Sequence, residues 1–293
     1  MEKEITPINK LSWSDKLKSY TKHPGSFVLL LLVSISAVLT VTVLIYLVGY
    51  ILIHGVPYLK PDLFSFTYNS DNVSMMPAII NTVTMVLLAL LFSVPFGIGA
   101  AIYLVEYAKK GNKFVELVRV TAETLTGIPS IVYGLFGMLF FVRALGWDYS
   151  MLAGAATLAI MVLPVIMRTT EEALLCVPDS FREGSFGLGA GKLRTIFKIV
   201  LPSAIPGILS GVILAIGRIV GETAALIYTA GTVAQVAGIM NSGRTLAIHM
   251  YSLSREGLHT NEAYATAVVL LVVVLLINGL SSLIARKLES AKE

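Results

Sequence analysis

The chain has 293 residues, of which 56% are apolar and 14% are charged, with a mean hydropathy of +0.80 and a formal net charge of +4. This composition excludes a soluble domain of this size, because soluble domains carry about a quarter of charged residues. Long uncharged runs instead predict an all-α integral membrane protein. The single cysteine, Cys176, cannot form an internal disulfide, and the four histidines lack metal-ligand spacing, so we expect no metal site.

Six apolar segments reach or approach the length of about 20 residues that a helix needs to cross a bilayer. They are residues 27–53, 77–105, a segment that begins within 115–126 and ends at 142, 151–167, 203–230 and 263–285. Gly127 and Pro129 are expected to bend or break the third segment. The fourth is expected to end near Pro164.

Basic residues in short loops predict the orientation, because Lys and Arg resist translocation. Seventeen lie in segments 1–26, 106–126, 168–202 and 286–293, against four in the other loops: Lys60, Arg143, Arg244 and Arg255. Both termini are therefore expected in the cytoplasm. Anionic lipid headgroups are the expected neighbours of this positive charge, and no nucleic acid is needed to explain it.

The same analysis divides the chain into consecutive parts. They are a cytoplasmic tail (1–26), a first transmembrane helix (27–53), an external loop (54–76), a helical core (77–285) that contains a cytoplasmic loop (168–202), and a cytoplasmic tail (286–293). No part is large enough to form a soluble domain with its own core. Function that needs soluble partners must therefore use the loops.

The fifth apolar segment contains two ionisable residues, Arg218 and Glu222. A helix that starts near Pro206 would rise about 18 Å by Arg218, close to the middle of a hydrocarbon layer of about 30 Å. Charged residues at that depth are candidates for function. Small and charged residues recur at helical spacing, which predicts one face packed on protein: Gly207, Gly211, Ala215, Arg218, Glu222, Ala225 and Thr229.

Two interpretations of the charged residues are open. In the first, Arg218 and Glu222 form an ion pair at i to i+4 spacing that only fixes helix packing. In the second, Arg218 faces a translocation path, where its guanidinium binds two oxygens of an oxyanion at once. Glu222 would then keep the binding weak enough for release. Thr223 and Thr229 complete the candidate path.

The loop 178–202 reads PDSFREGSFGLGAGKLRTIFKIVLP and predicts two short helices joined at a glycine hinge. Ser180 and Glu183 have the spacing of a capping box, and Gly189 can take a positive φ. GLGAGK is similar to a phosphate-binding P-loop, but Phe186 and Leu193 occupy the positions that need Gly and Ser or Thr. The chain is therefore not expected to bind ATP.

The spacing of this loop resembles the EAA loop of the permease subunits of binding-protein-dependent ABC importers. In that family the loop forms a short coupling helix that docks on a cytoplasmic ATPase. The resemblance implies that eight residues of this loop couple the chain to the ATPase: Ser180, Glu183, Gly184, Ser185, Gly189, Ile199, Leu201 and Pro202. Gly184 and Ser185 stand where the family has two alanines, which lowers the local helix propensity.

Further strings resemble phosphate-importer permeases of the PstA type. They are GIPSIVYGLFG at 127–137, GRIVGETAALIYTAG at 217–231, and residues 245–257. The resemblance covers about residues 77–285 and implies a type I ABC importer permease with six transmembrane helices, in the cytoplasmic (inner) membrane of a prokaryote. It implies a homologous second permease subunit, two copies of an ATPase through which ATP acts, and an extracytoplasmic phosphate-binding protein.

The resemblance also implies that this chain binds no cofactor and catalyses no reaction. Its expected substrate is inorganic phosphate, and the alternative is another oxyanion such as sulfate, molybdate or a phosphonate. A membrane enzyme or a sensor is a competing class. An enzyme would need a nucleophile and base or a metal cluster, and a sensor would need a soluble output domain; the sequence contains neither.

Overall fold

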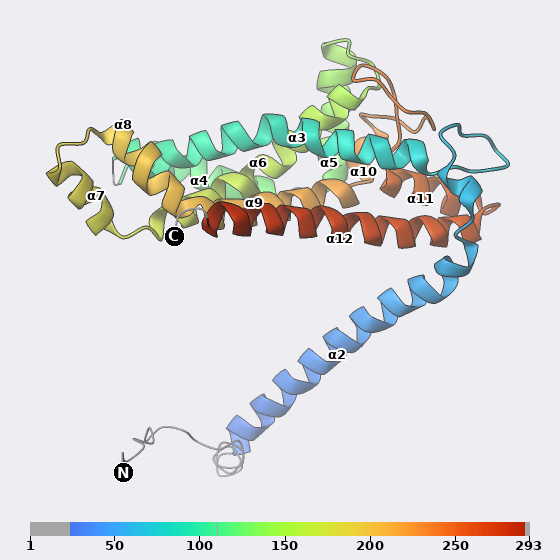
Figure 1. The fold of residues 1–293 in the computed structure, drawn as a ribbon, viewed down its shortest axis with the longest axis horizontal. Coiled ribbons are helices and arrows are strands. Elements are labelled where there is room, and N and C mark those ends of the chain that lie inside the picture. The colour runs from blue at the N-terminus through green and yellow to red at the C-terminus, as the bar shows by residue number, and fades with distance from the viewer. Residues whose placement is uncertain (1–23, 110, 291–293) are drawn as a thin grey trace. The chain divides into compact units, whose positions relative to one another are not determined.

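The computed structural model describes residues 24–109 and 111–290 (Figure 1). This described part contains helices and no β-strand, as expected for an all-α protein. Residues 1–23 of the expected N-terminal tail, residue 110 and residues 291–293 of the expected C-terminal tail lie outside the described residues. The chain divides into two units, Met1–Ile53 and His54–Glu293, and each is described by itself.

The α-helices follow the chain in this order: α2 (Pro24–Gly55), α3 (Met76–Ile102), α4 (Lys113–Thr126), α5 (Ser130–Gly137), α6 (Met151–Leu175), α7 (Asp179–Gly187), α8 (Lys192–Thr195), α9 (Leu201–Gly221), α10 (Ala224–Ile227), α11 (Leu246–Glu256) and α12 (Thr260–Ser290). Short 3₁₀ turns occupy Val56–Tyr58 and Pro61–Phe64. Wider π-helical turns at Tyr103–Tyr107, Met138–Ala144 and Ile196–Val200 extend α3 and α5 and connect α8 to α9.

Five of the described helical segments are long and apolar enough to cross a membrane. They are Gly25–Tyr58, Met76–Tyr107, Met151–Leu175, Lys192–Gly221 and Thr260–Leu283. Apolar residues occur on every side of α2, which is typical of a membrane-spanning helix. These segments confirm five of the six expected spans.

The remaining expected span, which is the third along the chain, is broken. Its two halves, Lys113–Thr126 and Ser130–Ala144, meet at an angle of 102°. At 1.5 Å per residue the halves are about 21 Å and 22 Å long, so neither half alone crosses a hydrocarbon layer of about 30 Å. The break falls at Gly127 and Pro129, as expected, and Pro129 takes an extended backbone (ψ 140°) just before α5 begins.

Two expected boundaries are wrong. α6 does not end near Pro164 but continues to Leu175, with the proline inside the helix. Helical structure before Arg218 begins at Lys192, not near Pro206, and Pro206 also lies inside its helix. Neighbouring helices can satisfy the backbone groups that proline leaves free, so proline does not end a membrane helix as reliably as a soluble one.

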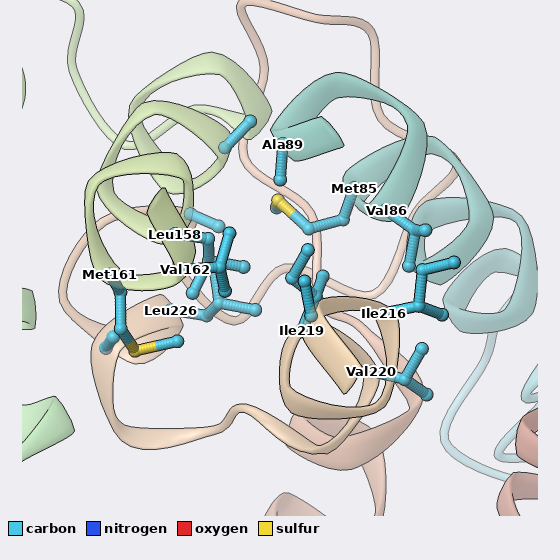
Figure 2. Close-up of a cluster of buried hydrophobic side chains, with 14 of the residues drawn as sticks. Met85, Val86, Ala89, Leu158, Met161, Val162, Ile216, Ile219, Val220 and Leu226 are labelled. Carbon is cyan, nitrogen blue, oxygen red and sulfur yellow. The ribbon is translucent and has the colours of Figure 1, made fainter. Parts of the chain in front are cut away.

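The central core lies between α3, α6 and α9. α6 is the most enclosed, with 67% of its most apolar stretch buried against 33% for the spans that contain α3 and α9. Figure 2 shows Met85 of α3, Leu158 of α6 and Ile219 of α9 pointing toward one another, with Leu226 of α10 beside them. Because lipid is as apolar as these side chains, close packing rather than exclusion from water stabilises the contact.

Small residues bring α9 close to α6. A Cβ atom added at Gly211 would overlap the Thr169 hydroxyl, and one at Gly207 would meet Cβ of Ala173 at 2.5 Å. The expectation that these small residues pack on protein is therefore confirmed. Gly217 and Gly221 differ, since an added Cβ would meet no other described atom within 4 Å.

The two ends of the second unit carry different structures. α7 and α8 lie at one end, and α11 lies at the other (Figure 1). At the α11 end, the Asn81 amide of α3 donates to the carbonyls of Gln235 (2.8 Å) and Arg244 (3.1 Å) and accepts from the Ala237 N–H (3.0 Å). These bonds fasten the long loop between α10 and α11 to the start of α3.

Replacing Gly211 by alanine is expected to destabilise the protein by about 1–3 kcal/mol, because the added methyl group overpacks the α6–α9 contact. Gly217→Ala is the matched control: its methyl group meets no described atom, and alanine favours the helix. The measurement is the thermal unfolding midpoint of the purified protein in detergent. Equal midpoints for the two variants would contradict the close packing described above.

Candidate functional site

Arg218 lies in the last turn of α9 and is half-buried. The helix ends at Gly221 because the next residue, Glu222, takes an extended backbone (φ −74°, ψ 129°). A new short helix, α10, begins at Ala224. The segment that was expected to be one helix over 203–230 is thus broken just after its charged residues.

Glu222 stabilises this break. Its carboxylate, on a residue only 9% exposed, accepts a hydrogen bond from the Ala225 N–H (3.1 Å) in the first turn of α10. A carboxylate at a helix start satisfies a free N–H and meets the positive end of the helix dipole. The expectation that Arg218, Glu222 and Thr229 share one helix face is therefore wrong, because the backbone turns between them.

Arg218 has no partner carboxylate in the described part of the chain. Among the described residues, no Asp or Glu oxygen lies within 4.0 Å of its guanidinium nitrogens. The Arg218–Glu222 ion pair of the first interpretation is absent. Instead, the guanidinium stands at the C-terminal end of α9, where the negative end of the helix dipole favours a cation.

Two of the three sequence strings that carried the resemblance to phosphate-importer permeases, 127–137 and 217–231, pack against each other. An added Cβ at Gly134 of α5 would meet Cα of Ala225 at 2.8 Å, and one at Gly137 would meet the Thr229 methyl group at 2.7 Å. Gly134 is needed because α10 approaches so closely, and Gly137 because Thr157 of α6 and Thr229, just after α10, approach it. The break in the third span and the break after α9 therefore belong to one structural unit.

Tyr133 connects α5 to α4 across the break in the third span. The Tyr133 side chain is buried, and its hydroxyl donates to the Leu125 carbonyl (2.8 Å) at the end of α4. This bond holds the two halves of the broken span together.

The two threonines of the candidate path have different surroundings. Thr223 lies in the break itself and is half-buried, with its hydroxyl 3.5 Å from the Gly221 carbonyl. Thr229 is fully buried, and its hydroxyl donates to the Ala225 carbonyl (2.9 Å). Thr223 is thus partly accessible, whereas Thr229 packs against Gly137.

The predicted coupling loop forms two short helices, α7 and α8, joined by a turn, as expected. Gly189 in this turn has a positive φ of 82°, a conformation that favours glycine. The hydroxyls of Ser185 and Thr195, both buried, lie 2.8 Å apart and tie α7 to α8. The capping box is wrong: Ser180 lies inside α7, whose preceding residue is Pro178, and no side chain caps the helix.

The outer side of α7 and α8 is exposed and apolar. Glu183 and Gly184 are exposed, as are Leu188 (92%), Leu193 (65%) and other large side chains. A shallow hollow beside them is lined by Ser185, Leu188, Gly189, Ala190, Arg194, Lys198 and Ile199. Leu201 and Pro202 are half-buried at the start of α9. Contiguous exposed apolar groups of this kind are typical of a protein interface.

Arg182 anchors α7 to the helix bundle, a role that the sequence analysis did not assign. Its guanidinium donates to the Glu106 carboxylate (2.8 and 3.0 Å) at the end of the second span and to the carbonyls of Leu174 (3.0 Å) and Val177 (2.8 Å) after α6. The side chains of Arg182 and Glu106 are 14% and 9% exposed. Both are charged residues at the edge of apolar segments, and only the fold brings them together.

His249 of α11 lies fully buried at the opposite end of the second unit. Burial and the nearby positive charge of Arg244 lower its pKa to about 3, and the Val73 backbone opposes this only in part. Neither ring nitrogen makes a hydrogen bond of good geometry. The imidazole is therefore neutral at physiological pH.

Comparison with known proteins defines the class. Residues 93–291 match the family described as "Binding-protein-dependent transport system inner membrane component". The match covers more than half of the chain, and the chain belongs to this family, which confirms the resemblance inferred from the EAA-like loop. The chain is thus the membrane permease component of an ABC importer.

Individual relatives extend over most of the chain. The chain is 34% identical to "Probable ABC transporter permease protein YqgI" of Bacillus subtilis over 266 residues. The aligned part covers 83% of this chain and 88% of that protein. The chain is 31% identical over 274 residues to "Phosphate transport system permease protein PstA" of Haemophilus influenzae, with 90% and 95% covered.

Solved structures share the fold. A bacterial alginate ABC transporter, crystallised with an alginate pentasaccharide-bound periplasmic protein, matches with a TM-score of 0.68 at 16% identity over 92% of this chain and 97% of that chain. The MetNI methionine ABC transporter in an inward-facing conformation matches with a TM-score of 0.57 at 21% identity over 72% and 93%. The expected type I ABC importer permease fold is thereby confirmed.

Arg182→Ala is expected to destabilise the protein by about 3–5 kcal/mol, because it leaves the Glu106 carboxylate buried without its partner. The double variant Arg182→Ala, Glu106→Gln should regain part of that loss. Arg194→Ala, which removes an exposed arginine from α8, is expected to change stability by no more than about 0.5 kcal/mol. Thermal unfolding midpoints of the purified transporter are measured for these variants and for the single variant Glu106→Gln, and additive effects of Arg182→Ala and Glu106→Gln in the double variant would rule out the interaction.

Acidification is expected to destabilise the protein through His249. The folded protein keeps this imidazole neutral, whereas the unfolded chain protonates it below pH 6.5, so its contribution is complete above that pH and is lost as the pH falls toward 3. Between pH 7 and pH 5 the loss is about 2 kcal/mol. His249→Gln should reduce the slope of unfolding midpoint against pH, and His259→Gln is the control. Identical slopes in wild type and His249→Gln would contradict the buried neutral state.

Proposed function

We propose that this permease passes inorganic phosphate across the membrane and that Arg218 lies on its path. The observation that carries the proposal is an arginine without a partner carboxylate, where the third and fifth spans are both interrupted. A guanidinium binds two oxygens of a phosphate with good geometry. Relatives named phosphate transport system permeases support the choice of substrate.

The interrupted helices support the same path. Transporters commonly bind ions and polar substrates where membrane helices are broken, because helix ends and free backbone groups are available there. Glu222 holds one break in place, and Thr223 offers a half-buried hydroxyl beside it. The Glu222 carboxylate also repels an anion, which prevents binding too tight for release. Thr229 does not face the path itself in this proposal; it is buried and packs against Gly137, which keeps the path-lining segment in position.

The end that carries α7 and α8 faces the cytoplasm in this proposal, and both termini lie on that side. The basic residues Lys192, Arg194 and Lys198 at this end follow the positive-inside rule. A separate ATPase, present in two copies, binds the apolar surface around Leu188 and Leu193 and supplies the energy of ATP. This chain itself binds no nucleotide.

In this proposal α7 moves together with the helix bundle as one rigid body. Arg182 joins α7 to the ends of α3 and α6, and the Ser185–Thr195 contact joins it to α8. Rigid-body motion of packed helices is a common way to switch a transporter between two openings. A homologous second permease completes the pathway, and an external binding protein delivers phosphate to the end that carries α11.

The test is labelled-phosphate uptake by the complete transporter in vesicles. Arg218→Ala is expected to reduce uptake by at least tenfold, which corresponds to the loss of about 1.4 kcal/mol or more of binding to a charged group. Arg218→Lys should retain part of the uptake, and Arg255→Ala, an exposed arginine of α11, should retain all of it.

Assembly must be measured alongside uptake, by co-purification of the ATPase with each variant. Normal uptake by a fully assembled Arg218→Ala transporter would remove this residue from the mechanism. Labelled sulfate and molybdate, supplied with their own binding proteins, test the alternative substrates. Uptake of those anions in place of phosphate would reassign the substrate but keep the path.

A further inference from the structure

Buried polar atoms without hydrogen-bond partners gather at the start of α11. Among the described residues, such atoms belong to three side chains: Nε and Nη2 of Arg244, Oγ1 of Thr245, and the two ring nitrogens of His249, of which one makes no more than a weak contact with the Val73 backbone. These residues are 6%, 2% and 0% exposed. Buried polar groups are nearly always paired, so a cluster of this kind indicates that a polar group from outside the chain completes it.

Backbone hydrogen bonds and contacts with the Tyr68 ring hold the cluster in place, so its side-chain nitrogens remain available. The Arg244 carbonyl accepts from the Asn81 amide of α3 (3.1 Å). Cζ of Arg244 lies 4.5 Å from the centre of the Tyr68 ring, and the same ring meets His249 edge-on at 6.3 Å. Thr245 and His249 are one helical turn apart, since the His249 N–H donates to the Thr245 carbonyl (2.8 Å). Three separate segments of the chain therefore converge on these groups.

The charge of the cluster is uncompensated and positive. Among the described residues, no carboxylate oxygen lies within 4.0 Å of the Arg244 guanidinium. The start of an 11-residue helix adds the positive end of its dipole, and the N-cap residue Thr245 makes no side-chain cap bond. The Tyr68 ring offsets part of the charge. Water could occupy the free donors, but only an anion would also neutralise the guanidinium.

We propose that Arg244, Thr245 and His249 form a second oxyanion site, at the end of the second unit opposite α7 and α8 (Figure 1). Its ligand is a small protonated oxyanion of the phosphate type. The inference rests on the proposed function, which makes this the outer end. The site receives the anion there before it moves on to Arg218.

The residue types favour phosphate over sulfate. Arg244 supplies two free N–H groups for unprotonated oxygens, and Thr245 supplies a hydroxyl that can donate or accept. His249 is neutral, so one of its nitrogens is a hydrogen-bond acceptor. Phosphate at neutral pH carries at least one P–OH group that can donate to this nitrogen. Sulfate at neutral pH has no proton and would leave the acceptor unpaired.

The experiment measures equilibrium binding of labelled inorganic phosphate to the complete membrane complex in lipid nanodiscs, without ATP, with sulfate as competitor. Arg244→Met is expected to weaken phosphate binding at this end at least tenfold, and Arg244→Lys to weaken it less. His249→Phe should lower the preference for phosphate over sulfate at least tenfold. Arg255→Met, an exposed arginine on the same helix, is the matched control and should bind as the wild type does.

Nanodiscs with and without anionic lipid separate the two sources of phosphate groups. Binding of free phosphate that does not depend on anionic lipid supports the proposal. Strong competition by anionic lipid would overturn it in favour of a headgroup site. Unchanged phosphate binding in a correctly assembled Arg244→Met complex would also overturn it.

A measurement on the unaltered protein guards against variants that fail to assemble. A structure of the wild-type complex soaked with arsenate, a heavier protonated tetrahedral anion, is expected to contain the anion between Arg244 and Thr245. A carboxylate from a partner subunit, or water alone, in that position would overturn the proposal.

The two proposals can fail separately. Arg218→Met is expected to stop uptake while the Arg244 site still binds phosphate. Loss of uptake with intact Arg244-dependent binding leaves the second site in place, whatever carries the anion further. Normal uptake with no Arg244-dependent binding removes the second site and leaves the proposed function.

Discussion

A half-buried guanidinium, that of Arg218, which has no carboxylate partner among the described residues, is the constraint on which the arrangement of α9, α10 and α5 depends. A cation is unfavourable among apolar helices, and its cost is lower here because Arg218 lies in the last turn of α9, near the negative end of the helix dipole. The end of a helix leaves backbone groups without helical partners. Glu222 satisfies one such N–H group at the start of α10, and α5 packs against α10 through Gly134 and against Thr229 through Gly137. These contacts make Arg218, the two helix breaks and the glycines structurally dependent on one another.

In the proposed function, the same arrangement makes the site selective for anions. Had Glu222 paired with Arg218, the pair would have been neutral and the guanidinium occupied. The backbone turn at Glu222 instead directs the carboxylate to the Ala225 N–H and leaves the guanidinium available. A path for an anion needs a positive group that binds weakly and reversibly, and a nearby carboxylate that is already engaged supplies moderate repulsion without neutralising the cation.

Charged groups at the two ends of the second unit are used in opposite ways. At one end, Arg182 is fully paired, with the Glu106 carboxylate and two carbonyls, and such a pair is suited to holding α7 rigidly on the bundle. At the other end, Arg244 is equally enclosed but keeps two free donors. In the two proposals, the paired arginine transmits force and the unpaired one binds a ligand. The difference lies in the partners that the fold provides, not in the residue type.

The sequence alone determined the class of protein, five of the six expected spans, the interruption of the other at Gly127 and Pro129, and the two short helices around Gly189, because long apolar runs, proline and glycine act locally. It could not determine that α9 ends at Gly221. Residues 203–230 remain apolar and helical in spacing throughout, and the break depends on a carboxylate bond and on the approach of α5, which is 84 or more residues away in the chain. The ion pair of Arg182 and the open donors of Arg244 were likewise decided by tertiary structure, because a side chain's partner is set by the segments that packing brings beside it.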